Sequence, residues 1–180
     1  MSYVFVAKKL KKVFNYIKLV IDNLKKRKLK NLKRICLLSD SHGSRVKVED
    51  LIFSNHFDYI FFMGDGLRDF DNIDEDNLKK VSGNCDLFNF EAITQFVEVE
   101  GFKIMLTHGH EYRAKLTPLL MLKKAKENNC NIVCFGHTHK QISEEIDNIL
   151  LINPGSFKNN DYAVLSLQKN KKPTIEFLKY

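Results

Sequence analysis

A chain of 180 residues is long enough to form one domain with a sizeable apolar core. Its 44% hydrophobic and 28% charged residues are ordinary for a globular protein and exclude a disordered or fibrous chain. The net charge of +7 is unevenly placed, because residues 1–33 hold 11 of the 29 Lys and Arg but only one acid. Residues 34–180 therefore carry 18 basic and 21 acidic residues, a net charge of −3.

The first 33 residues have a composition of their own. Their apolar residues recur at the spacing of one helix face, and a run of four basic residues follows at positions 25–28. We predict a basic amphipathic extension at 1–33 ahead of a single domain at 34–180. Its role stays open between an extra helix or solvated tail, a membrane-surface contact, and docking to nucleic acid or an acidic partner. It lacks the features of a secretory signal.

The cysteine pattern points to a reducing compartment. The four cysteines form no C-x-x-C pair, and two of them lie in apolar runs where a free thiol behaves as a small hydrophobic group. No stretch is apolar over a length that could span a bilayer. We therefore predict a cytoplasmic protein.

From residue 34 onward, short apolar runs alternate with polar, glycine-containing breaks. Buried strands are predicted at 35–38, 59–63, 102–106 and 132–135, and helices at 46–55 and 116–129. This alternation favours an α/β arrangement with several parallel strands. Four later segments, joined by short turns, are predicted to form antiparallel hairpins: 141–146, 149–153, 162–167 and 174–178.

Side chains that can bind metals follow the predicted strands, where open α/β sheets place their binding loops. In chain order they are Asp40 and His42, Asp65, Asn84 and Asp86, His108 and His110, and His137 and His139. Carboxylates, imidazoles and a side-chain amide suit divalent transition metals. Two ions about 3.5–4 Å apart need a bridging carboxylate, and Asp65, isolated between two glycines, is the natural candidate. Each motif alone is weak evidence, whereas five in order at strand ends are specific.

At these positions the sequence resembles the calcineurin-like metallophosphoesterase superfamily, in particular its small bacterial and archaeal phosphodiesterases. The D-x-H, G-D, G-N-x-D, H-G-H and G-H-T-H blocks are present, as is the Asn-Pro-Gly-Ser turn at 153–156. The resemblance covers about residues 34–167. It implies a four-layer α/β/β/α sandwich of two mixed β-sheets flanked by helices.

The resemblance also implies a binuclear metal centre that hydrolyses a small phosphodiester by in-line attack of a hydroxide bridging two divalent ions. It assigns one ion to Asp40, His42 and His139, a second to Asn84, His108 and His137, and the bridge to Asp65. Asp65, Asn84 and His108 would also serve catalysis. Manganese is the usual activating ion in the family, with iron, nickel, cobalt or zinc as alternatives among which the ligands do not choose.

Three further positions carry predictions. His110 is a candidate substrate contact, with a plain surface or supporting histidine as an equal alternative. Asp86 is expected to orient the Asn84 loop by accepting backbone hydrogen bonds. Cys85 stands where many relatives have a histidine that is taken to help protonate the leaving group.

Two alternative functions remain beside the phosphodiesterase hypothesis. One is a non-catalytic metal-binding scaffold resembling the retromer subunit of this fold, although that relative lacks the asparagine that this chain has at position 84. The other is a nuclease that grips nucleic acid with its basic extension. The sequence predicts neither the physiological substrate nor the oligomeric state.

Overall fold

The computed structural model describes residues 32–74, 76–87 and 90–180. The predicted N-terminal extension lies almost wholly outside these residues, and its helix stays a prediction. The first strand begins at Lys33. Within the described residues, no helix has the length and apolar character needed to cross a lipid bilayer.

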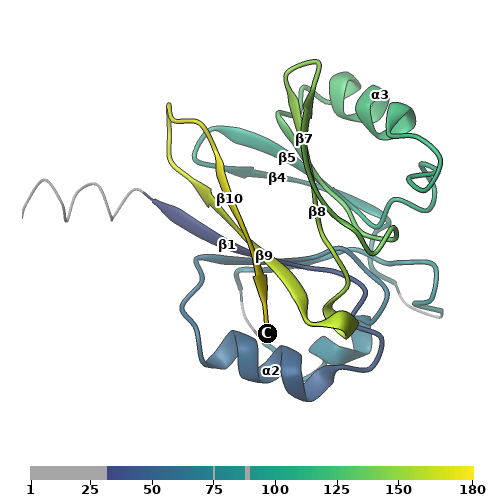
Figure 1. The fold of residues 1–180 in the computed structure, drawn as a ribbon, viewed down its shortest axis with the longest axis vertical. Helices are drawn as coiled ribbons and strands as arrows, with labels where there is room; N and C mark the ends of the chain where they lie inside the picture. The colour runs from purple at the N-terminus through teal and green to yellow at the C-terminus, as the bar shows by residue number, and fades with distance from the viewer. Residues whose placement is uncertain (1–31, 75, 88–89) are drawn as a thin grey trace, which may run out of the picture. The chain divides into compact units, whose positions relative to one another are not determined.

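Two five-stranded mixed sheets form the centre of the fold (Figure 1). The first sheet has the order β10 (Thr174–Lys179), β9 (Asp161–Leu167), β1 (Lys33–Leu38), β2 (Tyr59–Phe62) and β3 (Leu78–Lys80). The second has the order β4 (Thr94–Val99), β5 (Phe102–Thr107), β6 (Ile132–Cys134), β8 (Ile149–Pro154) and β7 (Gln141–Ile146). Strands β1, β2 and β3 are parallel to one another, as are β5, β6 and β8.

Successive side chains of a strand point to opposite faces of the sheet, so each sheet has apolar residues on both faces. In β1, Ile35 and Leu37 join the core between the sheets, whereas Cys36 and Leu38 face the outer layer of the first sheet. Helix α2 (Arg45–Phe53) and the 3-10 turn η1 (Leu67–Phe70) cover that outer face. Helix α3 (Leu119–Glu127) covers the outer face of the second sheet (Figure 1). The predicted four-layer α/β/β/α sandwich is confirmed.

Loops that leave the carboxyl ends of the parallel strands bond directly to one another. The Asp40 N–H donates to the Gly64 carbonyl over 2.9 Å, which joins the loops after β1 and β2. The Gly136 N–H donates to the His108 carbonyl over 3.1 Å, which joins the loops after β6 and β5. The His137 N–H donates to Asp40 Oδ2 over 3.1 Å, and this bond connects the two sheets. The loops predicted to carry the site thus meet at one edge of the sandwich.

The predicted helices and hairpins are present with small boundary differences. The hairpin between β7 and β8 turns at Asp147 and Asn148, whose φ angles of 52° and 62° suit the tight turns that favour these residue types. Strands β3 and β4 were not predicted as residue ranges. Strand β4 shows why. Its sequence TQFVEV lies at a half-exposed sheet edge, so it lacks the apolar run that marks a buried strand.

Candidate metal centre

The structure brings all seven predicted ligands into one cluster at the edge where the loops meet. Six of them follow the strands β1, β2, β5 and β6, and Asn84 lies in the loop after β3. No other part of the described chain gathers three or more His, Cys, Asp or Glu side chains at metal-binding spacing. The ligand atoms form two groups, one around His108 Nε2 and one around Asp40 Oδ1.

The first group of ligands surrounds His108 Nε2. This atom lies 3.2 Å from Asn84 Oδ1, 3.2 Å from His137 Nδ1 and 3.4 Å from Asp65 Oδ2. Donor atoms that share an ion at bond lengths of about 2.1 Å lie about 3.0–3.4 Å apart in octahedral or tetrahedral geometry. Each of the three distances to His108 Nε2 therefore suits a pair of ligands on one ion, and Asp65 and Asp40 are the acids that lie at metal-binding spacing with His108.

The second group surrounds Asp40 Oδ1, which lies 3.0 Å from His139 Nε2 and 3.9 Å from His42 Nε2. Asp40 is fully buried, and this oxygen has no hydrogen-bond partner among the described residues. Its other oxygen accepts hydrogen bonds from the Ser39 hydroxyl over 2.6 Å and from the His137 N–H. A buried carboxylate oxygen without a donor is costly unless a cation neutralises it, so this oxygen is suited to a metal ion.

Asp65 belongs to both groups. Its Oδ2 lies 3.4 Å from His108 Nε2 and 3.9 Å from His42 Nε2, while its Oδ1 accepts the Cys85 N–H over 2.7 Å. Burial raises the pKa of Asp65, but hydrogen bonds from His108 and Cys85 outweigh burial, so the net shift of its pKa is downward. Asp65 is thus a carboxylate placed between the two groups, as a bridging ligand must be.

A hydrogen bond on the side away from the cluster orients the His108 imidazole. His108 Nδ1 donates to the Met63 carbonyl over 2.6 Å, which turns Nε2 toward the cluster. Burial lowers the pKa of His108, but the Asp65 and Asp40 carboxylates outweigh burial and raise it. Burial and the neighbouring His108 lower the pKa of His137 to about 4, so this imidazole is neutral near pH 7 and its Nδ1 can bind a metal.

The backbone at the cluster adopts conformations that few residue types accept. Five predicted ligands have positive φ angles: Asp40 (53°), His42 (42°), Asp65 (62°), His137 (66°) and His139 (59°). Such conformations are strained for residues other than glycine, and strain of this kind gathers at functional sites. A Cβ on Gly136 or Gly83 would collide with Ser39 Oγ or Asp65 Oδ1, so glycine is required beside the ligands at both positions.

Two carboxylates hold the loops in place. Asp86 accepts four backbone N–H groups, from Asp65 (2.7 Å), Gly66 (2.8 Å), Leu67 (2.9 Å) and Gly83 (2.9 Å). It thereby joins its own loop, which carries Asn84, to the loop of Asp65. Asp69, which sequence reasoning missed, accepts the Ser41 hydroxyl (2.6 Å) and the N–H groups of Gly43 (2.9 Å) and Ser44 (3.0 Å). It fixes the loop of His42, and no local sequence signal separates it from an ordinary acid.

His110 and Cys85 lie beside the cluster. The His110 ring is centred 5.4 Å from that of His108 and 6.2 Å from that of His137, and its Nδ1 is buried without a described partner. The exposed Cys85 thiol accepts the Asn84 amide over 3.3 Å and lies close enough to His42 and Asp65 to form a third group of potential ligands. Burial and Asp65 raise the pKa of Cys85, which disfavours a thiolate in the absence of metal.

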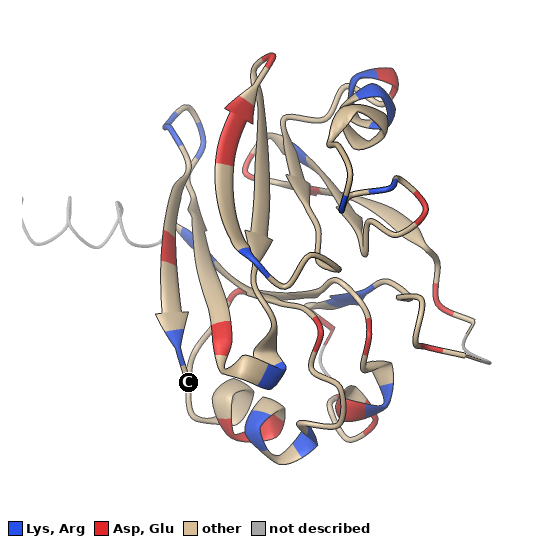
Figure 2. Ribbon diagram, turned by 45° about the vertical axis from the view of Figure 1, so that its right-hand side comes forward, with Lys and Arg blue, Asp and Glu red and all other residues tan. Residues whose placement is uncertain are grey.

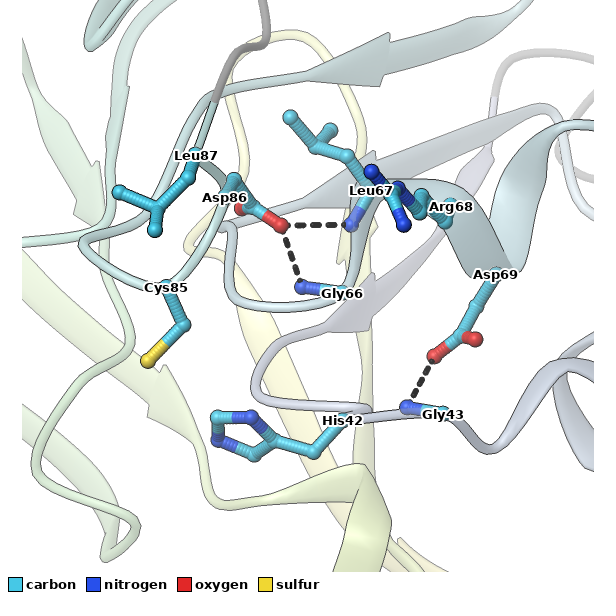
Figure 3. Close-up of a pocket in the computed structure, with 9 residues that line it drawn as sticks. All are labelled: His42, Gly43, Gly66, Leu67, Arg68, Asp69, Cys85, Asp86 and Leu87. Carbon is cyan, nitrogen blue, oxygen red and sulfur yellow. Dashed lines mark hydrogen bonds between the residues drawn. The ribbon is translucent and has the colours of Figure 1, made fainter.

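A pocket of about 450 Å³ opens beside the cluster (Figure 3). The nine residues that line it are His42, Gly43, Gly66, Leu67, Arg68, Asp69, Cys85, Asp86 and Leu87. Its volume is in the range of small-molecule sites. His42 connects the pocket to the metal ligands, so a ligand held at the cluster could extend into it.

Comparison with known proteins identifies relatives of this chain. The probable metallophosphoesterase YsnB of Bacillus subtilis is 29% identical over 151 residues, which cover 79% of this chain and 89% of YsnB. The phosphodiesterase YfcE of Escherichia coli K12 is 33% identical over 84 residues, 42% of each chain. The structure of Vacuolar Protein Sorting 29 from Cryptosporidium parvum covers 83% of this chain and 98% of its own, with a TM-score of 0.65 and 20% identity, and so shares the fold.

A sequence profile of a whole family matches most of the described sandwich. The sequence profile of the calcineurin-like phosphoesterase superfamily domain matches residues 34–170. This range includes every predicted ligand and all strands except the last. The chain belongs to the calcineurin-like phosphoesterase superfamily.

Proposed function

We propose that this chain is a metal-dependent phosphodiesterase with two divalent ions. The observation that carries the proposal is the position of Asp65, whose Oδ2 lies 3.4 Å from His108 Nε2 and 3.9 Å from His42 Nε2. Asp40, His42 and His139 would hold one ion, and Asn84, His108 and His137 the other. When bound, the two ions would bind phosphate oxygens and supply hydroxide near neutral pH.

The positions and charges of the chain's own residues favour phosphodiester hydrolysis at this site. The ligand set contributes two carboxylates, Asp40 and Asp65, so a centre with two divalent ions keeps a net positive charge that attracts phosphate. His108 and His137 act as neutral ligands in that state, because binding an ion displaces the proton from a nitrogen donor. Asp86 keeps the Asp65 and Asn84 loops at a fixed separation.

A diester is favoured over a monoester as the substrate. A monoester presents a dianion, which usually requires several basic side chains, whereas Arg68 is the only Lys or Arg among the nine residues that line the pocket. The similarity to YfcE, which is called a phosphodiesterase, supports the same choice. Manganese is our expectation for the activating ion, and a cytoplasmic location also remains a prediction.

The scaffold alternative is less well supported by the site. Asn84 Oδ1 lies 3.2 Å from His108 Nε2, so the asparagine that the retromer subunit lacks is present beside the proposed ligands. The nuclease alternative gains no support from the described residues, where Lys and Arg are dispersed among Asp and Glu rather than gathered in one stripe (Figure 2).

The proposal is tested on the full chain after its metal has been removed and restored. Elemental analysis with added Mn²⁺ should reach two ions per chain, and hydrolysis of bis(4-nitrophenyl) phosphate should rise with loading and exceed that of 4-nitrophenyl phosphate. Saturation at one ion, or full loading without hydrolysis of either ester, would contradict the proposal. The second result would favour the scaffold.

A further inference from the structure

The pocket beside the metal centre has an uneven distribution of charge. Two acids line it, but backbone donors compensate both of them. Both oxygens of Asp86 accept N–H groups, and one oxygen of Asp69 accepts two N–H groups and the Ser41 hydroxyl. Figure 3 draws the bonds from Gly66 and Leu67 to Asp86 and from Gly43 to Asp69. A carboxylate held by several backbone N–H groups repels a neighbouring anion less than a free one does, because the amide dipoles offset its charge. The two acids therefore oppose the binding of an anionic ligand less than free carboxylates would.

Arg68 supplies the one permanent positive charge of the pocket lining. It lies in η1, where its carbonyl accepts the Arg45 guanidinium, and the same guanidinium bonds Asp71 over 2.9 Å. The backbone of Arg68 is thus held in place. Its own guanidinium makes no hydrogen bond or ion pair with any residue in the described part of the chain. Because the backbone of Arg68 is held and its exposed guanidinium is unpaired, the guanidinium is available to bind a ligand.

The arrangement of the pocket sets Arg68 apart from the metal ligands. In Figure 3, His42 and Cys85 lie together on one side, and Arg68 lies on the other side with Asp69. Leu87, which is 71% exposed, provides an apolar surface at the same pocket. Figure 3 places Leu87 on the same side of the pocket as Cys85, so a diester phosphate held at the metal centre would have an apolar surface beside it and could extend one ester group across the pocket toward Arg68.

We propose that Arg68 is a specificity-determining residue that selects phosphodiesters whose esterified group carries a second anion, a carboxylate or a phosphate. This inference rests on the proposed phosphodiesterase function and names the substrate class of that site. Guanidinium binds both anions through paired hydrogen bonds, so the chemistry is shared. The apolar part of the ester group would lie against Leu87.

Two matched substrate pairs test the proposal with metal-loaded protein. The first pair is bis(4-nitrophenyl) phosphate and bis(4-carboxyphenyl) phosphate, in which a neutral nitro group replaces a carboxylate of similar shape. Both diesters are symmetric, so either ester group can occupy the pocket. The second pair is the dinucleotide ApA and its 5′-phosphorylated form, which differ only in a terminal phosphate. The variant is Arg68→Met, which keeps an unbranched chain about as long as the stem of arginine up to Nε and removes the charged end.

Arg68→Met should lower kcat/KM for the anionic member of a pair about tenfold more than for the neutral member, because one charge-assisted contact is lost. The matched control is Lys123→Met, which removes an exposed charge from α3 and should change this ratio less than about twofold. An effect in one pair supports the proposal and identifies the anion. Equal losses on both members of both pairs would overturn the role of Arg68 and leave the proposed function standing. No metal-dependent hydrolysis of any diester by the wild type would overturn the proposed function and this inference together.

Discussion

The four backbone hydrogen bonds to Asp86 make the Asp86→Asn variant a sensitive test of how the metal loops are held. Asparagine keeps one acceptor oxygen and turns an NH₂ group toward two N–H donors. A hydrogen bond to a charged group contributes about 1.5–3 kcal/mol, and the carboxylate is half-buried, so water partly replaces the lost bonds. We expect a net loss of about 2 kcal/mol, which corresponds to about 30-fold weaker metal binding if the loss falls on the loops.

The assay is competition for Mn²⁺ against a chelator of known affinity, together with urea denaturation of the metal-free protein. The two measurements separate weaker metal binding from a general loss of stability. Glu98→Gln is the matched control, because it removes one exposed carboxylate from β4, which carries none of the predicted ligands. Mn²⁺ affinity within about twofold of wild type in Asp86→Asn would refute the reasoning that these bonds set the spacing of the ligand loops.

Three further predictions concern the ligands, the leaving group and the N-terminal extension. Asp65→Ala should abolish turnover and bind fewer than two ions, with a greater loss than His137→Ala, because it removes a ligand from both groups. Steady-state kinetics and elemental analysis check this. Cys85→His should raise activity on alkyl diesters more than on aryl diesters, since an imidazole can donate a proton to a poor leaving group, whereas Cys85→Ser should change little. An inactive Cys85→Ser protein would instead indicate a ligand or nucleophile. A chain without residues 1–31 should fold and hydrolyse small diesters at the wild-type rate, and circular dichroism with kinetics would reveal any loss.

Sequence patterns predicted that the candidate ligands lie close together because two independent signals coincide at their positions. Short apolar runs locate the buried strands, and parallel strands bring their carboxyl ends to one edge, so polar residues that follow these runs must lie close together. His108 illustrates this, since it comes directly after β5 and lies at the centre of its group. The same logic could not assign interatomic distances or choose which nitrogen of an imidazole faces the cluster. Those depend on contacts with residues far away in sequence, such as Met63.

Features that lack an apolar run could not be predicted from the sequence. Strand β4 is half exposed and is defined by its pairing with β5, which no local pattern records. Asp69 is an acid in a short polar segment, and only the folded loop shows that it accepts three donors. Arg68 likewise gains its significance from the pocket that it lines.

The predicted ligands are divided between the two sheets, so metal binding should affect the stability of the whole sandwich. Asp40, His42 and Asp65 follow strands of the first sheet, whereas His108, His137 and His139 follow strands of the second. Bound ions would therefore cross-link the halves of the sandwich, and each ion that binds only the folded state adds about 2.7 kcal/mol of stability at 100 times its dissociation constant. Melting temperature in a panel of divalent metals thus ranks candidate native ions without any substrate. An ion that raises it by clamping both sheets should also suppress proteolysis of the loops between them.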